Sequence, residues 1–372
     1  MIPKQILQKT NLKAWKKVKE LGADGTIKLL KEKGLTGRGG ACFLTGLKWE
    51  FAKKTKNSEK FVICNADEGE PGTFKDKLIL ENNAENLIEG IMIAAYCIDA
   101  KQAYIYLRGE YYYLKDILEG IIKRVLSSSN SDIKIDIIEG AGAYICGDET
   151  AIINSIENKR GYPHFKPPYP VQKGLFGKPT VINNVETLAN VPLAILNSDW
   201  SDDLRLFSLS GDVSKAGVYE IKIGTNLGDI AKLAGAKDVK AVYFGAAGGC
   251  IPYKADFVVS SEHVCKEDAM LGACSLIFVS KKRSMLDMAI NISQFFKHES
   301  CGKCTPCREG NVHVLYLLEK IKSGEGNLEL LEELCVNIRD TALCGLGQSC
   351  TNHILTALKF VKNHKSWNDG GS

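Results

Sequence analysis

The sequence predicts an α/β protein of several domains, in which a mainly parallel sheet is followed by a small α+β module and a terminal bundle of helices. The first observation is length, because 372 residues are more than one hydrophobic core usually serves. The second is that short β-rich runs alternate with helical patterns through the first half of the chain. The third is that the pattern is helical from about Ser284 onward.

The predicted parallel sheet rests on three β-rich runs that end in turn or acidic residues, at 60–67, 103–110 and 133–140. The two segments between them, 84–98 and 111–126, have helical periodicity. Parallel strands joined by helices bind ligands beyond their carboxyl ends, where glycine-rich and acidic segments lie in this sequence. A following loop with five of the chain's ten prolines is too rigid for a plain connector, so we expect it to form a wall or lid.

Three domains are predicted from these patterns. Residues 1–200 form the parallel-sheet domain, residues 201–283 the α+β module, and residues 284–372 the bundle. The helical patterns of the predicted four-helix bundle span 286–300, 309–321, 328–343 and 351–364.

Composition excludes several classes of protein. The chain is 45% hydrophobic and 25% charged, as ordinary globular proteins are, and its net charge of +4 argues against nucleic acid as a partner. The longest apolar stretch, 87–98, is too short to span a membrane. Thirteen cysteines without a signal-peptide pattern are typical of a reducing compartment, and we expect the cytoplasm, at most beside a membrane complex.

The segment HESCGKCTPCREG places Cys301, Cys304 and Cys307 three residues apart. This spacing puts three thiolates on one face of an iron–sulfur cluster and leaves a fourth ligand to a distant residue. The candidates, in order of preference, are Cys344, Cys350 and Cys335. Zinc is the competing metal, but structural zinc usually uses two paired knuckles, so a 4Fe–4S cluster fits better. Such a cluster carries electrons and performs no chemistry on a substrate.

The segment GLTGRGGACFLTGLKW contains five glycines, which let backbone N–H groups approach a phosphate, and Arg38 and Lys48 add positive charge. It matches neither the dinucleotide fingerprint nor the P-loop, and a plain glycine-rich turn is an equal alternative. Two acidic segments follow predicted strands and suit ribityl or ribose hydroxyls, which favours NAD over NADP. Their carboxylates are Asp67, Glu68 and Glu70, then Asp148 and Glu149.

Further polar and aromatic side chains lie near these loops in the sequence. The polar set is Asn183, Asn184 and Thr187, which have little reason to cluster unless they meet a ligand. The aromatic set could sandwich flat rings, although each member alone is more often a core residue. This set is Phe43, Phe51, Tyr144, Phe165, Tyr169 and Phe176.

Taken in order, these motifs resemble one family over residues 34 to about 348. It is the flavoprotein subunit that oxidises NADH in respiratory complex I, with relatives in NAD(P)-linked hydrogenases and formate dehydrogenases. The motifs are TGRGGACFLTGLKW, NADEGEPGTFKD, IYLRGEY, GAGAYICGDETAIINSIE, KPPYP, PTVINNVETLANVP, ESCGKCTPCREG and CGLGQ. The resemblance implies a Rossmann-like FMN domain, a β-grasp module and a four-helix bundle with one 4Fe–4S cluster.

The resemblance also implies a set of site residues. Those expected at FMN are Gly37, Arg38, Gly39, Lys48, Asn65, Asp67, Gly147, Asn183, Asn184 and Thr187, with Gly40 and Asp148 as further cofactor contacts. Those expected at NADH are Phe43, Phe51, Glu68, Glu70, Tyr144, Glu149, Lys166 and Tyr169. The cluster ligands are expected to be Cys301, Cys304, Cys307 and Cys344.

The implied activity is hydride transfer between nicotinamide and FMN, followed by single-electron transfer through the cluster to a partner, in either direction. No side chain need act as acid or base, and Glu68, Glu70 and Glu149 position the substrate. The expected partners are a thioredoxin-like 2Fe–2S subunit and a further electron-accepting or catalytic subunit, because no other cysteine set follows the bundle. CGLGQ favours the hydrogenase and formate dehydrogenase branch. The alternatives are a flavin-free iron–sulfur relay and a part of an electron-bifurcating complex.

Overall fold

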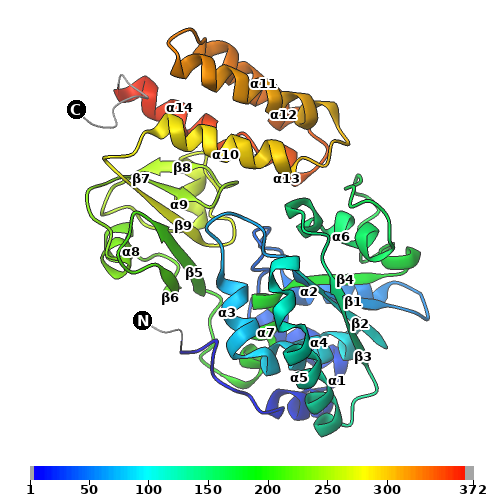
Figure 1. Cartoon of the computed structure of the whole chain (residues 1–372). Coiled ribbons are helices and arrows are strands. Elements are labelled where there is room, and N and C mark those ends of the chain that lie inside the picture. Colours follow the sequence, from blue (N-terminus) through cyan, green and yellow to red (C-terminus); the bar gives the residue numbers. More distant parts are fainter. Residues whose placement is uncertain (1–3, 365–372) are drawn as a thin grey trace. The chain divides into compact units, whose positions relative to one another are not determined.

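The computed structural model of the chain (Figure 1) describes residues 4–364, which form two compact units. The first unit comprises residues 4–69 and 74–204. The second unit comprises Glu70–Thr73 and the described residues from Arg205 onward. The last eight residues of the predicted third domain, 365–372, lie outside the described residues.

The first unit contains a four-stranded, fully parallel sheet with the strand order β3-β2-β1-β4. Its strands are β1 (Phe61–Ala66), β2 (Gln102–Leu107), β3 (Lys134–Glu139) and β4 (Thr180–Asn184). The three strands predicted from β-rich runs are confirmed, and so is the parallel sheet. β4 was not predicted, because its five residues follow the proline-rich loop and end in two asparagines, which are poor strand formers.

Helices connect and cover these strands. They are α1 (Lys13–Glu32), α2 (Thr45–Lys54), α3 (Lys75–Asn82), α4 (Ala84–Ile98), α5 (Lys115–Ser129), α6 (Glu149–Ile156) and α7 (Val185–Leu196). Short 3₁₀ segments occur at η1 (Gly109–Leu114), η2 (Tyr144–Gly147) and η3 (Leu175–Gly177). The helix predicted at 84–98 is confirmed, whereas the one predicted at 111–126 begins as 3₁₀ and becomes α-helical at Lys115.

The apolar stretch 87–98 belongs to α4, which is buried along nearly its whole length. Glu89 lies within it at 1% exposure, and its carboxylate accepts the Trp15 backbone N–H at 2.8 Å near the start of α1. The apolar character of α4 is therefore that of a core helix. Over residues 4–364 we find no helix with the length and hydropathy that crossing a membrane requires.

The second unit contains a mixed five-stranded sheet of order β6-β5-β9-β7-β8, in which β5 and β9 are parallel and β7 is antiparallel to β8 and β9. Its strands are β5 (Leu204–Gly211), β6 (Gly217–Lys222), β7 (Val239–Phe244), β8 (Cys250–Pro252) and β9 (Ser275–Ser280). Its helices are α8 (Leu227–Ala234) and α9 (Ser261–Lys266). The sequence patterns at 204–213, 217–224, 226–235 and 239–249 predict strand, strand, helix and strand, and β5, β6, α8 and β7 confirm them. β8, β9 and α9 were not predicted.

The remaining helices of the second unit are α10 (Met285–Glu299), α11 (Thr305–Lys322), α12 (Leu328–Thr341), α13 (Gly345–Ser349) and α14 (Asn352–His364). The four long helices predicted from periodicity are present: α11 packs against α10 and α12, and α14 packs against the same two. α14 also packs on β8, where Thr356 Oγ1 accepts the Cys250 N–H at 2.9 Å. The division of the chain into three domains remains a prediction.

The close packing of α4 on α7 predicts that a side chain at Gly90 would destabilise the protein. A Cβ at this position would overlap the carbonyl oxygen of Leu188 in α7, so Gly90→Ala must push the two helices apart. We expect a loss of about 1–3 kcal/mol in the free energy of unfolding, measured by urea denaturation. In the control Gly120→Ala in α5, the added Cβ meets nothing within 4 Å, and we expect a gain of up to about 1 kcal/mol. Equal stabilities of the two variants would contradict the close packing.

Candidate active site and iron–sulfur region

The candidate site begins where the strand order of the parallel sheet reverses. The chain builds outward from β1 through β2 to β3, then returns to place β4 on the other side of β1. Asn65, at the end of β1, is in register with Asn184, at the end of β4. Ligands in open parallel sheets bind outside the carboxyl ends of the strands at such a reversal. Asn65 and Asn184 therefore lie at the edge of the sheet that this rule selects.

The glycine-rich loop closes on itself by two contacts. Gly37 N–H donates to Phe43 O at 2.8 Å, and Thr36 pairs with Leu44 as an isolated antiparallel bridge. Gly39 lies against Asn184, since a Cβ on Gly39 would be 3.4 Å from Asn184 Cβ. The loop thus brings side-chain-free backbone to the start of α7, a 12-residue helix whose N-terminus attracts anions.

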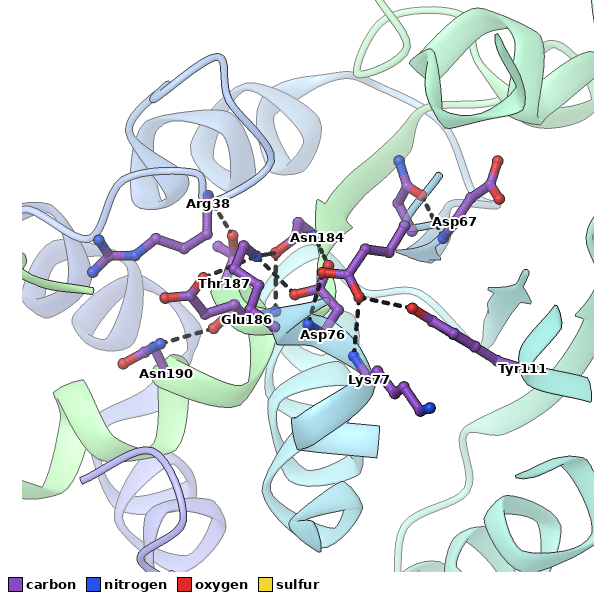
Figure 2. Close-up of polar contacts among 12 residues, drawn as sticks. Arg38, Asp67, Asp76, Lys77, Tyr111, Asn184, Glu186, Thr187 and Asn190 are labelled. Atoms are coloured by element: carbon purple, nitrogen blue, oxygen red, sulfur yellow. Dashed lines mark hydrogen bonds and ion pairs between the residues drawn. The ribbon is translucent and has the colours of Figure 1, made fainter. Parts of the chain in front are cut away.

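Arg38 is arranged differently from what its place in the loop suggests. Its backbone N–H donates to Thr187 Oγ1 at 2.9 Å, which joins the loop to α7. Its guanidinium is buried and pairs with Asp202 at 3.0 Å, and Figure 2 shows it pointing away from Asn184. The positive charge that the sequence seemed to offer a phosphate is therefore already paired. Asp202, which also accepts hydrogen bonds from Thr36, was not recognised in the sequence.

A buried ionic network lies beneath this edge (Figure 2). Lys75 is 1% exposed, and its ammonium group contacts Asp76 at 2.8 Å and Glu186 at 2.9 Å. Burial alone would lower the pKa of Lys75, but the carboxylates around it raise that pKa, so the lysine stays charged. Asn184 Nδ2 donates to Asp76 at 2.5 Å, and Asn184 Oδ1 accepts the Glu186 N–H as the cap of α7. The network thereby fixes the start of α7 to the start of α3.

Glu68, which was expected to position NADH, is a buried cap of α3. Its carboxylate accepts the backbone N–H groups of Asp76 at 2.9 Å and Lys77 at 3.1 Å. The hydroxyl of Tyr111 donates to the same carboxylate at 3.1 Å. Burial and the nearby charge of Asp76 raise the pKa of Glu68 to about 7, against the lowering effect of these N–H donors. Glu68 therefore changes charge close to neutral pH.

The two carboxylates of the second acidic segment, Asp148 and Glu149, have different partners. Asp148 caps α6 by accepting the N–H groups of Thr150 and Ala151. Glu149 instead lies between Lys48 and Lys166, with both ammonium groups at 2.8 Å. Burial would raise the pKa of Glu149, but the two lysines lower it to about 2.

Two asparagine amides connect this region to the sheet. Asn65 Nδ2 donates to Gly147 O at 2.9 Å, and its Oδ1 accepts the Asp67 N–H at 3.1 Å. Asn183 Oδ1 accepts the indole N–H of Trp49 at 2.9 Å. Lys48 also donates to Ile182 O at 2.9 Å, so α2 is attached to β4. The structure thus brings the loops after β1, β3 and β4 together within the first unit.

The predicted aromatic set divides by exposure. Five members leave about half or more of their surface open: Phe43, Phe51, Phe165, Tyr169 and Phe176. Tyr144 lies against the loop after β1, since a Cβ on Gly69 would be 3.2 Å from its ring. Phe176 packs edge-on against Phe61, so it is a structural contact of β1. Exposed aromatic rings are the side chains that stack on flat ligand rings.

Glu70 belongs to the second unit, unlike the other predicted nucleotide residues. Its carboxylate accepts the Ala247 N–H at 3.0 Å, in the turn between β7 and β8. Gly72 is held in the same unit by Ser275, whose hydroxyl donates to its carbonyl oxygen at 2.7 Å. The loop after β1 therefore leaves the first unit for four residues and returns to it at Phe74.

The cysteine triplet begins after α10 and ends in the first turn of α11, which contains Cys307. Cys304 is the N-cap residue of α11, and Cys344 is the N-cap residue of α13. Burial and the neighbouring sulfurs of Cys307 and Cys304 raise the pKa of Cys301, so the three thiols are close to one another. A Cβ on Gly347 would be 3.7 Å from Cys307 Sγ, so the turn that begins at Cys344 lies against the triplet.

This donor set offers cysteine sulfur, the ligand that iron–sulfur clusters bind. Over residues 4–364, no three His, Cys, Asp or Glu side chains converge as the ligands of one metal ion would. A 4Fe–4S cube binds four thiolates, each on a different iron, so its ligands surround a volume instead of meeting at a point. Cysteines at helix N-termini also favour the thiolate form. Cys335 is buried within α12, where burial raises its pKa, which makes it a poor ligand.

Comparisons with known proteins agree with both regions. The model of the Nuo51 FMN-binding domain matches residues 30–193, and that of the NADH-ubiquinone oxidoreductase-F iron-sulfur binding region matches residues 287–365. The NADH-quinone oxidoreductase F subunit of Aquifex aeolicus is 42% identical, over 92% of this chain and 85% of that one. The alpha subunit of the NAD-reducing hydrogenase HoxS of Cupriavidus necator is 41% identical, over 91% of this chain and 60% of that one.

Solved structures show the same likeness. A chain of the NAD+-reducing NiFe hydrogenase in its H2-reduced state matches with a TM-score of 0.87 and 35% identity, over 95% of this chain. The air-oxidized state gives a TM-score of 0.85 and 37% identity, over 93% of this chain. This chain spans 64% and 62% of the length of those two hydrogenase chains.

Fold and site together define an oxidoreductase subunit with a flavin-binding α/β region and an iron–sulfur region. The chain belongs to the family of the F subunits of NADH-quinone oxidoreductase, together with the corresponding subunits of NAD(P)-reducing hydrogenases. The predicted family is confirmed, as are the predicted cofactors of that family, FMN and a 4Fe–4S cluster, with NADH as its substrate.

The raised pKa of Glu68 predicts how the stability of the protein changes with pH. Because its pKa is raised on folding, the stability that protonated Glu68 contributes is fully present below about pH 4.5 and lost as the pH rises through about 7. We expect the free energy of unfolding of the wild type to fall relative to Glu68→Gln over this range by a few kcal/mol, at about 1.4 kcal/mol per pKa unit. Urea denaturation between pH 4.5 and 8 measures it.

The variant Tyr111→Phe provides the matched comparison. It removes a hydroxyl that donates to the Glu68 carboxylate, so it should raise the pKa of Glu68 further and move the fall in stability to higher pH. A wild type and Glu68→Gln whose difference in stability stays constant from pH 4.5 to 8 would contradict the assigned environment of Glu68.

Proposed function

We propose that FMN binds at the carboxyl edge of the parallel sheet and that NADH binds beside it. The observation that carries the proposal is the register of Asn65 with Asn184 at the reversal of strand order, with Gly39 against Asn184. The proposed FMN residues are Gly37, Arg38, Gly39, Gly40, Lys48, Asn65, Asp67, Gly147, Asp148, Asn183, Asn184 and Thr187. Arg38 would act through its backbone, since its guanidinium pairs with Asp202.

NADH is proposed to contact the exposed rings of Phe43, Phe51 and Tyr169. Glu149 and Lys166, paired with each other, would meet its polar groups together with Tyr144. Glu68 and Glu70 act in this proposal mainly through the loop that carries them, because both carboxylates already accept backbone N–H groups. FMN bound here supplies hydride exchange with nicotinamide and one-electron exchange with the cluster. The residues themselves bind, orient and exclude water.

Cys301, Cys304, Cys307 and Cys344 are proposed as the cluster ligands, within a C-terminal four-helix domain at 284–372 that follows a β-grasp module at 201–283. The relatives named above are subunits of larger assemblies, so we propose that electrons pass to or from a partner. That partner would be a thioredoxin-like 2Fe–2S subunit, with a hydrogenase, formate dehydrogenase or complex I type assembly beyond it. The cytoplasm is the proposed location.

The flavin site is tested by Gly39→Ala. The added Cβ meets Asn184 only at ordinary van der Waals distance, so the apoprotein should fold normally, while the backbone loses its close approach to a phosphate. We expect FMN to bind at least about tenfold more weakly, or about 1.4 kcal/mol, measured by fluorescence titration of the apoprotein. Gly25→Ala in α1 is the control and should bind FMN as the wild type does. Equal affinity in both variants would place FMN elsewhere.

The cluster ligands are tested by comparing two cysteines outside the triplet. Cys344→Ala should lose the 4Fe–4S signal in low-temperature EPR and lose iron, because a ligand is missing. Cys335→Ala should keep both, because this thiol lies within α12 and is fully buried in its core. Loss of the cluster in Cys335→Ala but not in Cys344→Ala would reverse the assignment of the fourth ligand.

A further inference from the structure

Cys307 differs from an ordinary helix cysteine in the number of polar side chains around its sulfur. The amide of Asn311 lies 3.4 Å from Cys307 Sγ, and the hydroxyl of Ser300 lies 3.3 Å from it. The thiol of Cys350 lies beside the same sulfur, because contact with Cys307 and burial raise the pKa of Cys350. Cys307 is 5% exposed, and Asn311 and Cys350 are 1% exposed, so water does not compete for these contacts.

Packing gives no reason for an amide at position 311. The residue follows Cys307 by one helical turn on the inner face of α11, among Gly310, Val314 and Leu315. Burying an amide there costs roughly 1–3 kcal/mol unless its N–H groups find acceptors. Asn311 Nδ2 finds two, the carbonyl oxygen of Cys307 at 2.8 Å and its sulfur at 3.4 Å. Its amide is therefore directed at the proposed cluster ligand.

Cys350 is the second side chain beside the Cys307 sulfur. It follows α13, and its S–H donates to the carbonyl oxygen of Gly347 at 3.2 Å. A thiol has one proton to donate, and hydrogen bonds to a charged acceptor are the stronger ones. An iron-bound Cys307 thiolate, which is charged, would therefore draw the S–H of Cys350 away from the neutral carbonyl oxygen of Gly347. Cys350 then acts as a donor to a ligand, and Cys344 remains available as the fourth ligand.

We propose that Asn311 and Cys350 are positioning residues that donate hydrogen bonds to the Cys307 sulfur and raise the reduction potential of the 4Fe–4S cluster. The inference rests on the proposed function, which makes Cys307 a ligand. Reduction adds negative charge that spreads onto the cysteine sulfurs, so donors to a sulfur stabilise the reduced cluster more than the oxidised one. Both donors come from side chains, so substitution can remove them individually.

The test uses the full chain with its cluster, purified anaerobically as wild type, Asn311→Leu, Cys350→Ala and Cys350→Ser. The measurements are iron content and an EPR-monitored redox titration of the cluster. We expect full iron content in all four, and a reduction equilibrium constant about tenfold lower in Asn311→Leu and in Cys350→Ala, which is about 59 mV for one electron. Cys350→Ser keeps a donor and should restore most of the potential.

Thr351→Val is the control for a merely structural effect. Thr351 is fully buried and donates to Cys335 O at 3.0 Å, so its loss removes a buried hydrogen bond next to Cys350 and should leave the potential unchanged. Unchanged potentials in Asn311→Leu and Cys350→Ala with full iron overturn the inference. Loss of iron in Cys350→Ala also overturns it, because Cys350 would then be a ligand. A wild type without a cluster would instead contradict the proposed function on which the inference rests.

Discussion

The buried ammonium group of Lys75 is the constraint on which the first unit most depends. A charge removed from water costs several kcal/mol unless it is paired, and here Asp76 and Glu186 pair it from the starts of α3 and α7. Removing either carboxylate would leave the lysine charge under-compensated. Both helices must therefore start where they do, which fixes Asn184 as the cap of α7 and Thr187 as the acceptor of the glycine-rich loop. The candidate flavin site is built on these two helix starts.

Much of the fold could be predicted because its signals are local. Alternating β-rich and helical runs identify β1, β2 and β3, and spacing alone identifies the cysteine triplet. β4 was missed because a short strand ending in Asn183 and Asn184 lacks the residues that mark strands. Its place beside β1 depends on pairing over more than a hundred residues, which no local pattern reports.

The sequence predicts which residues belong to the candidate site better than it predicts what each of them does. The sequence identifies Arg38 and Glu68 as residues of the site. It does not show that the Arg38 guanidinium pairs with Asp202 or that Glu68 caps α3. Lys75, Asp76 and Glu186 were overlooked because each is an ordinary charged residue in its own helix. Their role depends on burial, which the sequence does not show. The only signal in the sequence is that they lie within two segments already singled out, NADEGEPGTFKD and PTVINNVETLANVP. Such roles depend on contacts between residues that are far apart in the sequence, and a single segment does not reveal these contacts.

The proposed flavin residues lie in the first unit, and the four cysteines proposed as cluster ligands lie in the second. Glu70, which is proposed at NADH, also belongs to the second unit. The central claim is that one chain connects the two functions, and the most direct measurement is an anaerobic titration of the purified chain with NADH, following flavin absorbance and low-temperature EPR together. The account predicts that NADH bleaches the flavin and that a reduced 4Fe–4S signal appears with it, with little response to NADPH. A flavin that responds to neither nucleotide, or a cluster that stays oxidised while the flavin is bleached, would contradict it.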